Sequence, residues 1–488
     1  MRILFLSDNF PPETNAPATR LHEHAVRWVR AGHEVTVITC APNFPEGRLF
    51  KGYANRWRQV EMVDGIRVVR VKTYITANEG FIRRTLDYMS FMVTGAVAGL
   101  FEKRPDIVVS TSPQFFCAVA GWVVSGLRRL PWVFELRDLW PASIVAVGAM
   151  GNSPLVRLLE RLELFMYRRA SAIIPVTESF REDLVARGID RKKIHVVING
   201  VDLDRYAPRP RDAALAREFG LEGKFVIGYV GTHGMAHALE RVLDAAELLR
   251  HRQDIAFFFA GAGAARAEVE RQAIERGLDN VRMIPRQPKE AMPALWSLCD
   301  LALIPLRDTP VFSTVIPSKL FETMGMGVPV LMSLPKGEAT RIVERTDCGV
   351  CVPPEDARAM ANTVLALADD APRMARMRAA GLAAAPEYSR SRQAHRMEAI
   401  LAREARVDTS RAPMPEEEKA HPNPRSSEDI QPESCQENRL SRRSRPAKSA
   451  TSTRLDEVLP NRGCQVDGFT RNVETSTPIS PSDADGCR

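Results

Sequence analysis

Cysteine is scarce in this sequence, and its distribution excludes a disulfide scaffold. Eight cysteines are scattered over 488 residues. The short apolar run 2–7 passes directly into Asp8, which is not typical of a secretory leader. We therefore expect a cytoplasmic protein with free thiols, since disulfides are rare in a reducing compartment. The motif Cys348-Gly-Val-Cys351 has the spacing of a redox or zinc site, but a second metal-binding pair is lacking, so we expect a structural role.

The sequence also lacks a convincing membrane span. No charged residue occurs in 107–127, which is long enough to cross a bilayer. Segment 107–114 has the pattern of a strand that ends in a turn, so we predict a strand followed by a buried helix. The shorter uncharged segment 89–101 lies between Arg83-Arg84 and Lys103-Arg104. We expect a core helix there, with a helix on a membrane surface as the alternative.

Basic charge is concentrated in the first part of the chain. The first 200 residues contain 27 Lys and Arg and 19 Asp and Glu, whereas the remainder contains 40 and 41. This excess favours an acidic partner, either a nucleic acid or an anionic membrane surface. Basic motifs interleaved with aromatics, as in RNA-binding proteins, are not evident. The sequence therefore predicts a peripheral position on a membrane surface and no nucleic-acid partner.

Short runs of β-branched residues alternate with helical patterns in two successive series. The first series has runs at 3–7, 35–39, 66–71, 107–111, 132–135, 173–176 and 195–198. The second follows a turn-rich joint and has runs at 225–230, 255–260, 281–284, 301–305, 328–332 and 350–352. This alternation predicts an α/β protein with two Rossmann-like, doubly wound parallel sheets in tandem.

The predicted boundaries follow these series. Residues 1–203 form the first domain, 204–385 form the second, and 386–407 form a helix that packs back toward the first domain. From 408 to 488 the chain is dominated by Pro, Ser, Arg, Asn and Glu without periodicity. Such a segment buries too little apolar surface to offset its ordering entropy, so we predict a disordered tail.

Polar and turn-forming residues follow several of the predicted strands. They are Asp8–Asn15, Ser112-Pro113, Arg137-Asp138, Gly231-Thr232-His233-Gly234 and Gly261–Gly263. In open α/β sheets, ligands bind outside the carboxyl ends of the strands. Both domains therefore offer a polar edge, and two such edges make a cleft if they face each other.

The segment 317–322 carries the sharpest signal for a ligand. Pro317 and Ser318 begin a predicted helix, and a helix start presents free N–H groups and the positive end of the dipole, which suit a phosphate. Lys319 adds a full positive charge. Glu322 lies one residue too late to complete a capping box with Ser318, so its carboxylate is free to accept hydrogen bonds from a ribose diol. The sequence therefore predicts a nucleotide diphosphate site.

Seven motifs in order carry a family resemblance over about residues 1–400. They are Phe10–Glu13, Gly32–Thr39, Arg137–Pro141, Val176–Ser179, Asn199–Asp202, Pro317–Glu322 and Gly327–Val330. With them the chain resembles the retaining GT-B glycosyltransferases of family 4, particularly the bacterial O-antigen and capsule enzymes that act like fucosamine transferases.

The resemblance implies transfer of a sugar from a nucleotide diphosphate donor, usually UDP-linked, with retention at the anomeric carbon. It implies no metal and no other cofactor. The second domain holds the donor and the first faces the acceptor, which is a saccharide or a sugar on a polyprenyl diphosphate. The implied setting is surface polysaccharide synthesis at the inner face of the cytoplasmic membrane.

The resemblance implies roles for individual residues, which we assign by matching each position of the family motifs to this sequence. The implied catalytic residues are Arg137, Asp138 and Lys319. The implied donor-binding residues are Asn15, Ala16, Gly231, Thr232, His233, Gly234, Pro317, Ser318, Lys319, Leu320 and Glu322. We expect Arg137 and Asp138 to position the sugar or to stabilise charge, with a buried ion pair that orders the loop as the alternative.

Six positions depart from the family pattern. Thr314 stands where the first glutamate of the paired-glutamate motif is expected. Thr232 and His237 stand where many relatives carry an arginine and a lysine, Asn15-Ala16 replaces a glycine pair, and Arg137 replaces a histidine. Lys319 is therefore expected to be the main cation on the diphosphate.

Other functions and sites fit parts of this pattern. A nucleotide-sugar epimerase and a non-catalytic nucleotide-sugar-binding protein share the two-domain plan and remain alternatives. His233 and His237 have zinc-like spacing but no apparent third ligand. Asp202-Leu-Asp204 follows an Asn-Gly turn, a context that favours a turn over a metal site.

Overall fold

The computed structural model describes residues 1–44, 46–76, 81–112, 114–139 and 154–406. The predicted tail 408–488 lies outside the described residues, as do Pro113 and the last two residues of the Arg137–Pro141 motif.

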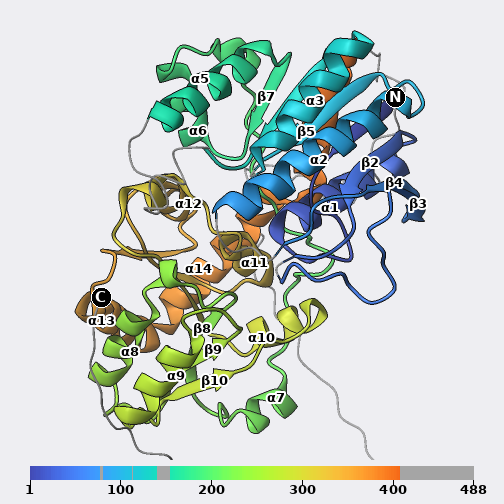
Figure 1. Ribbon diagram of the computed structural model, residues 1–488. Helices are drawn as coiled ribbons and strands as arrows, with labels where there is room; N and C mark the ends of the chain where they lie inside the picture. Colours follow the sequence, from blue (N-terminus) through green and yellow to red (C-terminus); the bar gives the residue numbers. More distant parts are fainter. Residues whose placement is uncertain (45, 77–80, 113, 140–153, 407–488) are drawn as a thin grey trace, which may run out of the picture. The chain divides into compact units, whose positions relative to one another are not determined.

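The first domain is built on a seven-stranded sheet with the order β3-β4-β2-β1-β5-β6-β7 (Figure 1). Its strands are β1 (Arg2–Leu6), β2 (Glu34–Cys40), β3 (Arg58–Val63), β4 (Ile66–Val71), β5 (Ile107–Thr111), β6 (Trp132–Leu136) and β7 (Ala172–Pro175). All neighbouring pairs are parallel except β3 with β4. The inner strands are buried on both faces, which explains why they appear in the sequence as continuous apolar runs.

The structure of this sheet differs from the sequence prediction at two places. The edge strand β3 was not predicted, because its residues alternate between exposed and half-buried and give no apolar run. The predicted strand 195–198 is not formed. Instead, the amides of His195 and Val197 donate to the carbonyls of Ile173 and Pro175, so this segment runs beside β7 without joining the sheet as a strand.

The second domain is built on a six-stranded sheet with the order β10-β9-β8-β11-β12-β13. Its strands are β8 (Phe225–Val230), β9 (Ile255–Ala260), β10 (Val281–Ile284), β11 (Leu301–Pro305), β12 (Val330–Ser333) and β13 (Gly349–Val352). All of its neighbouring pairs are parallel. The prediction of two doubly wound parallel sheets is confirmed.

Helices cover both faces of the first sheet. On one face, α2 (Phe81–Phe101), α3 (Phe115–Arg128), α5 (Pro154–Arg169) and α6 (Glu178–Ala186) share a core with the even-numbered residues of β1. On the other face, α1 (Ala16–Arg30) and α15 (Arg390–Ala405) share a core with the odd-numbered residues. Figure 1 shows α2 and α3 lying next to each other.

The last described helix, α15, belongs with the first domain. The indole of Trp28 on α1 donates to the carbonyl of Ala394 at 3.0 Å, and His33 contacts Glu398 at 2.7 Å. Met397 and Leu401 lie in the same core as Trp28. The chain therefore leaves the first domain near residue 200 and returns to it with α15.

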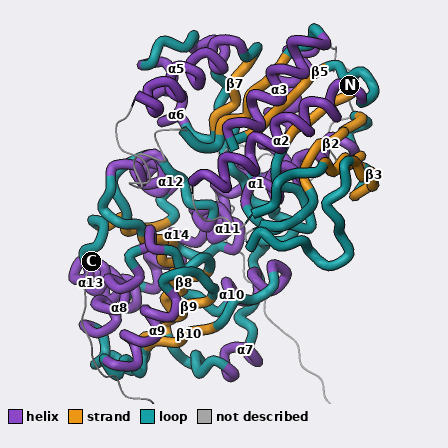
Figure 2. The backbone as a smooth tube through the Cα atoms, viewed as in Figure 1, coloured by secondary structure: helices purple, strands orange, loops and turns teal. Residues whose placement is uncertain are grey.

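The helices of the second domain lie on both sides of its sheet, as Figure 2 shows by colour. They are α7 (Ala213–Glu218), α8 (Leu239–Leu248), α9 (Arg266–Glu275), α10 (Met292–Ser297), α11 (Lys319–Met326), α12 (Glu338–Thr346), α13 (Ala357–Ala368) and α14 (Ala371–Ala384). Two apolar cores, one on each face of the sheet, hold these helices in place.

The uncharged segment 107–127 divides into β5 and α3, as predicted. Across the described ranges, no helix has the length and apolar character needed to cross a membrane. Segment 89–101 forms most of α2, which is a core helix on one side only, because several of its apolar residues are exposed.

Candidate functional site

Two glycine-rich turns pack backbone against backbone at the carboxyl edge of the second sheet. Residues 231–234 follow β8 and residues 261–263 follow the neighbouring strand β9. A Cβ on Gly261 would lie 1.8 Å from the carbonyl oxygen of Gly231, and one on Gly263 would lie 2.4 Å from that of His233. The amide of His233 donates to the carbonyl of Ala262 at 2.9 Å. Glycine is required at positions 261 and 263 because any side chain would separate the two turns.

The ammonium group of Lys319 lies against the first of these turns. Its Nζ is 3.8 Å from the centre of the Tyr229 ring, a cation–π contact. A Cβ on Gly231 would lie 2.6 Å from Cε of Lys319, so glycine leaves the room that the lysine occupies. Burial lowers the pKa of Lys319 to about 7, and Glu322 partly opposes this effect. The cation is thus held in a place where its own solvation is poor.

Two histidines pack against the ring of Tyr229. The ring centres of His233 and His237 lie 5.5 and 5.6 Å from that of Tyr229. Burial, together with the nearby cations, lowers the pKa of each histidine to about 4. His233 is fully buried, and neither of its ring nitrogens has a hydrogen-bond partner within the part of the chain that the structure describes. Both rings are therefore neutral at pH 7, and of these three side chains Lys319, with a pKa of about 7, is the one that can carry a positive charge there.

Helix α11 begins directly after Pro317-Ser318, as predicted, but the amides of Phe321 and Glu322 already donate to the carbonyl of Ser318. Ser318 is the N-cap residue and its hydroxyl makes no capping hydrogen bond. The amide of Leu320 donates to the carbonyl of Pro317, and the side chain of Leu320 is in the core, so Leu320 has little left to offer a ligand. Thr314 ends a short 3₁₀ turn, and its hydroxyl donates to the carbonyl of Val311.

Glu322 lies on the first turn of α11, and its carboxylate is partly held. The indole of the buried Trp296 donates to Oε2 of Glu322 at 3.3 Å. Burial raises the pKa of Glu322, whereas this hydrogen bond and the charge of Lys319 oppose the rise. The side chain retains acceptor capacity at its other oxygen. A sugar hydroxyl is a suitable donor for that oxygen.

In the first domain the predicted residues gather where α1 begins. Asn15 is the N-cap of α1: its side chain accepts from the amide of Ala18 and donates to Asn9. A guanidinium nitrogen of Arg137 donates to the carbonyl of Ala16 at 3.3 Å. The hydroxyl of Ser112 accepts from the amides of Arg137 and Asp138, which fixes the turn after β6.

Arg137 keeps its charge in these surroundings. Burial lowers the pKa of Arg137 to about 10, while the carboxylate of Glu135 acts in the opposite direction. Among the described residues, no hydrogen bond or ion pair joins Arg137 to Lys319. The predicted site residues thus form two groups, one at the carboxyl edge of each sheet.

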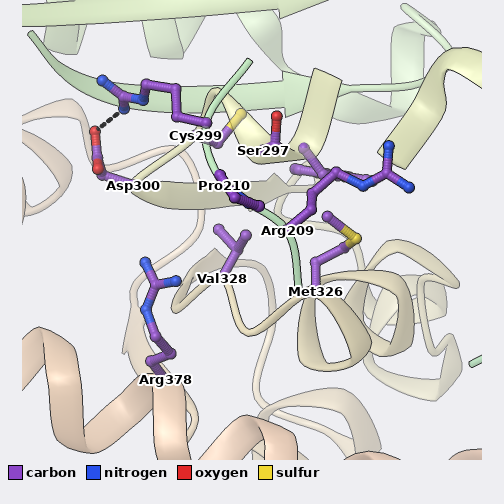
Figure 3. A pocket seen from close by; sticks show the side chains of 10 residues that line it. Arg209, Pro210, Ser297, Cys299, Asp300, Met326, Val328 and Arg378 are labelled. Atoms are coloured by element: carbon purple, nitrogen blue, oxygen red, sulfur yellow. Dashed lines mark hydrogen bonds and ion pairs between the residues drawn. The ribbon is translucent and has the colours of Figure 1, made fainter. Parts of the chain in front are cut away.

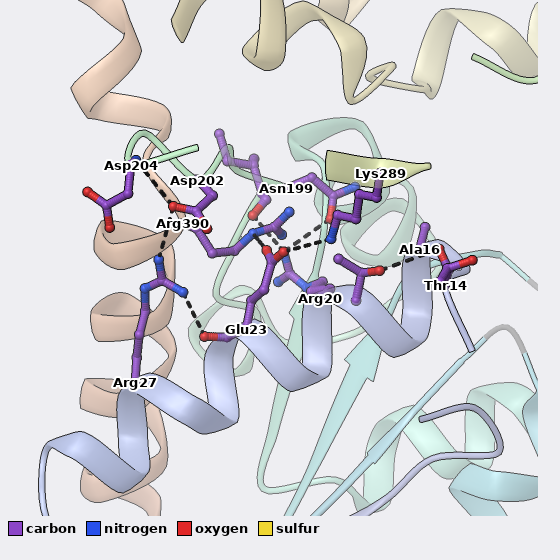
Figure 4. Close-up of polar contacts among 12 residues, drawn as sticks. Thr14, Ala16, Arg20, Glu23, Arg27, Asn199, Asp202, Asp204, Lys289 and Arg390 are labelled. Carbon is purple, nitrogen blue, oxygen red and sulfur yellow. Dashed lines mark hydrogen bonds and ion pairs between the residues drawn. The ribbon is translucent and has the colours of Figure 1, made fainter. Parts of the chain in front are cut away.

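Polar contacts join the two domains at α1 (Figure 4). Glu23 on α1 pairs with Lys289 of the second domain at 3.1 Å and with Arg390 of α15 at 2.7 Å. Burial alone would raise the pKa of Glu23, but Arg390 and Lys289 together hold it below its usual value. Arg20 is buried, pairs with Glu135 at 2.8 Å and donates to carbonyls of the segment that leaves the first domain.

A second contact between the domains involves the start of α6. The carboxylate of Glu338, at the first position of α12, accepts from the amides of Glu178 and Ser179 at 3.0 Å each, and from the Ser179 hydroxyl. A carboxylate at the positive end of a helix is a favourable arrangement. This contact ties α12 of the second domain to α6 of the first.

Tyr229, Trp296 and Glu338 were not predicted from the sequence. Tyr229 is the second-last residue of β8 and precedes the first glycine turn by two residues. Trp296 and Glu338 lie 26 and 160 residues from their partners Glu322 and Glu178. No spacing in the sequence indicates those contacts.

A cavity of about 220 Å³ lies elsewhere in the second domain (Figure 3). Asp300 and Val328, which precede β11 and β12, line it, and Arg211 pairs with Asp300 beside it. It therefore lies toward the amino ends of these strands, opposite to the glycine turns. None of the predicted site residues lines this cavity.

Comparisons with known proteins agree with this plan. Residues 15–200 match the family model described as a glycosyl transferase 4-like domain, and residues 212–383 match that of glycosyl transferases group 1. The putative colanic acid biosynthesis glycosyl transferase WcaI of Escherichia coli is 26% identical over 372 residues, which cover 74% of this chain and 90% of that protein. The 2-deoxystreptamine glucosyltransferase of Streptomyces kanamyceticus is 32% identical over 266 residues, which cover 49% and 67%.

Solved structures show the same architecture. The Anabaena protein Alr3699/HepE, solved in complex with UDP and glucose, superposes with a TM-score of 0.61 at 19% identity, covering 82% of this chain and 99% of that one. Sucrose-phosphate synthase from Thermosynechococcus elongatus gives a TM-score of 0.64 at 17% identity, covering 82% and 98%. At this identity the likeness establishes the fold. Together with the two family matches, it shows that the chain belongs to the GT-B glycosyltransferases of family 4.

Proposed function

We propose that this glycosyltransferase moves a sugar from a UDP-linked donor to a lipid-linked saccharide acceptor during synthesis of a surface polysaccharide. The observation that carries the proposal is the position of Lys319, whose ammonium group lies beside the Gly231 turn at the start of α11. The names of relatives agree in class: WcaI is described as a colanic acid enzyme, and TuaH of Bacillus subtilis as a teichuronic acid enzyme.

The donor phosphates would bind at the start of α11. The positive end of the helix dipole and the ammonium of Lys319 offer positive charge to the same ligand, whereas the amides of Leu320, Phe321 and Glu322 already donate to backbone carbonyls. Burial weakens the solvation of Lys319 in the free protein. A bound diphosphate would provide the ammonium group with an anionic partner in place of water. In this scheme the neutralisation of the leaving diphosphate comes from Lys319 and the helix, and we propose that no metal ion is required.

The ribose of the donor would be held by Glu322. Its free oxygen accepts from the diol while Trp296 keeps the other oxygen in place. In the first domain, Arg137 and Asp138 would position the transferred sugar and the acceptor at the end of β6. The acceptor hydroxyl would approach on the same face as the departing phosphate, and a phosphate oxygen would take its proton. Retention of the anomeric configuration follows from this same-face geometry.

The first test is a panel of UDP-sugars incubated with a polyprenyl diphosphate-linked acceptor, followed by mass spectrometry. Transfer that persists in the presence of EDTA supports the donor, the acceptor and the independence from metal, and NMR of the product tests retention of the anomeric configuration. Epimerisation of the donor in the absence of acceptor, which leaves its mass unchanged and is therefore read by NMR, would show that the protein is an epimerase. Tight UDP binding with no product from any donor would instead indicate a binding protein.

The second test concerns Glu322. Replacing it by alanine removes a charged hydrogen bond to the diol, which is expected to weaken UDP binding by roughly 1 to 3 kcal/mol. Glu322→Gln keeps the side chain and the acceptor for Trp296, and should weaken binding less. Glu218→Ala, at the exposed end of α7, is the matched control. Calorimetry that gave the same dissociation constant for all four proteins would remove Glu322 from the donor site.

A further inference from the structure

An apolar stripe runs along the exposed side of α2. Its members are Leu86, Met89, Val93, Val97 and Phe101, which are between 42% and 84% exposed. They are spaced by three or four residues and therefore lie on one side of the helix. We refer to these five residues as the α2 stripe. Single exposed apolar residues are ordinary on a protein surface, but five along one helix call for an explanation.

The opposite side of α2 is fixed in the core, so the stripe is a defined surface. Phe91 is fully buried and Ala98 nearly so. A Cβ on Gly99 would lie 2.8 Å from a methyl group of Val124 on α3, which shows how closely the two helices approach. Rotating α2 to bury the stripe would break this packing.

Basic residues stand at both ends of the stripe. Arg83 and Arg84 precede it and Lys103 and Arg104 follow it, and all four are exposed. At the far end, Glu102 is buried and paired with Arg58 at 2.7 Å and Arg67 at 3.1 Å, and Lys103 pairs with the exposed Glu34 at 2.8 Å, which leaves Arg104 as the unmatched cation beside the stripe among these residues. The exposed side of α2 thus presents apolar side chains between two positive ends.

The end of α3 extends this surface. Arg128 donates to the carbonyls of Gly99 and Glu102, which holds the ends of α2 and α3 together. Leu127 is exposed there, as is Arg129. The same combination of apolar and basic side chains therefore continues onto α3.

The charge pattern selects among possible partners. In a bilayer with anionic lipids, apolar side chains enter the boundary between headgroups and acyl chains while Lys and Arg bind the headgroups. A second copy of the chain fits poorly, because pairing two α2 stripes in either direction would place basic ends opposite basic ends. Like charges opposed in this way disfavour association.

We propose that the α2 stripe and its flanking basic residues bind this protein to the surface of an anionic lipid bilayer. The inference names the membrane-binding surface of the proposed function and rests on that function for its purpose, which is access to a lipid-linked acceptor. The helix would lie along the bilayer surface with Val93 and Val97 toward the acyl chains.

The test is co-sedimentation of the full chain with phosphatidylcholine vesicles that do or do not contain phosphatidylglycerol. Wild-type protein should bind the anionic vesicles. The double variant Val93→Asp, Val97→Asp and the single variant Phe101→Asp should each lower the partition coefficient at least tenfold. Ile274→Asp changes a residue that is 74% exposed on α9 of the second domain, and it should bind like wild type.

Charge is tested by a second pair of variants. Replacing Arg83 and Arg84, or Lys103 and Arg104, by glutamine should weaken binding about fivefold for each charge removed. The effect should shrink in high salt, because surface charges are screened. A loss of the same size in Ile274→Asp, or wild-type binding by the α2 variants, would overturn the proposal.

Two further measurements separate the alternatives. Sedimentation velocity in which the α2 variants dissociate a dimer, with vesicle binding unchanged, would show that a second copy covers the stripe and would refute the membrane surface. Turnover with a short, water-soluble diphosphate acceptor should be unchanged in the α2 variants. If wild type binds vesicles through α2 yet gives no transfer product, the proposed function fails while this inference stands. If wild type gives transfer product but does not bind vesicles through α2, this inference fails while the proposed function stands.

Discussion

Binding of the donor should be coupled to protonation of Lys319. In the free protein, burial lowers the pKa of Lys319 to about 7. A bound diphosphate places negative charge beside the ammonium and favours its protonated form, so the pKa rises on binding. A group whose pKa rises on binding takes up a proton, and the complex is favoured at low pH.

The size of the effect follows from the pKa. At pH 8 the free lysine is about one-tenth protonated, so binding should take up about 0.9 proton, whereas at pH 6 uptake should be about 0.1. The same linkage should weaken binding about tenfold between pH 6 and pH 8, or about 1.4 kcal/mol. In the free protein His233 and His237 are neutral across this range, because each has a pKa of about 4, so we expect Lys319 to dominate the proton uptake.

The assay is calorimetric titration with UDP-glucose, whose diphosphate does not titrate between these two pH values. Measuring in two buffers with different ionisation enthalpies gives the number of protons taken up. Lys319→Met should bind more weakly at pH 6 and lose both the uptake and the pH dependence. Lys51→Met removes an exposed lysine of the first domain and should behave like wild type. Proton uptake near zero in wild type at pH 8, or an unchanged pH dependence in Lys319→Met, would refute the reasoning.

Three further predictions concern the framework of the site. Arg20→Ala leaves the buried Glu135 without its partner, so the free energy of unfolding in urea should fall by about 3 to 5 kcal/mol, with the exposed Arg30→Ala as a near-neutral reference. Gly261→Ala forces a methyl group against the Gly231 carbonyl and should weaken donor binding at least fivefold by calorimetry. Gly126→Ala, where a Cβ meets nothing, should leave it unchanged. Glu338→Ala removes the acceptor for the amides that begin α6, and hydrogen exchange there should accelerate about tenfold; equal exchange in this variant and in the exposed Glu344→Ala would contradict the role of this contact.

Most of the fold was predictable because parallel strands buried on both faces appear as continuous apolar runs. Ile66–Val71 and Phe225–Val230 were predicted with the bounds that the structure has. β3 escaped prediction because an edge strand exposed on alternate residues gives no run. The segment 195–198 was predicted as a strand but does not form one. Its apolar residues pack beside β7, and this packing produces the same sequence pattern as a strand.

The candidate site was predictable only in part. A Pro-Ser pair before a helical pattern identified the start of α11. The ring beneath Lys319 and the indole on Glu322 depend on how strands and helices pack, which no local pattern records. Asn15 shows the converse: its capping of α1 gives a structural reason for this residue, independent of any contact with the donor.

The position of α15 has a consequence for the order in which the protein can fold. During synthesis, every strand of the first sheet has emerged long before Arg390, yet Trp28 and Val197 still lack Met397 and Leu401 beside them. An apolar face of the first domain therefore stays exposed to solvent until the whole second domain has been translated. Any fragment that stops short of this closing helix should be prone to aggregate, and supplying α15 as a separate peptide should rescue it.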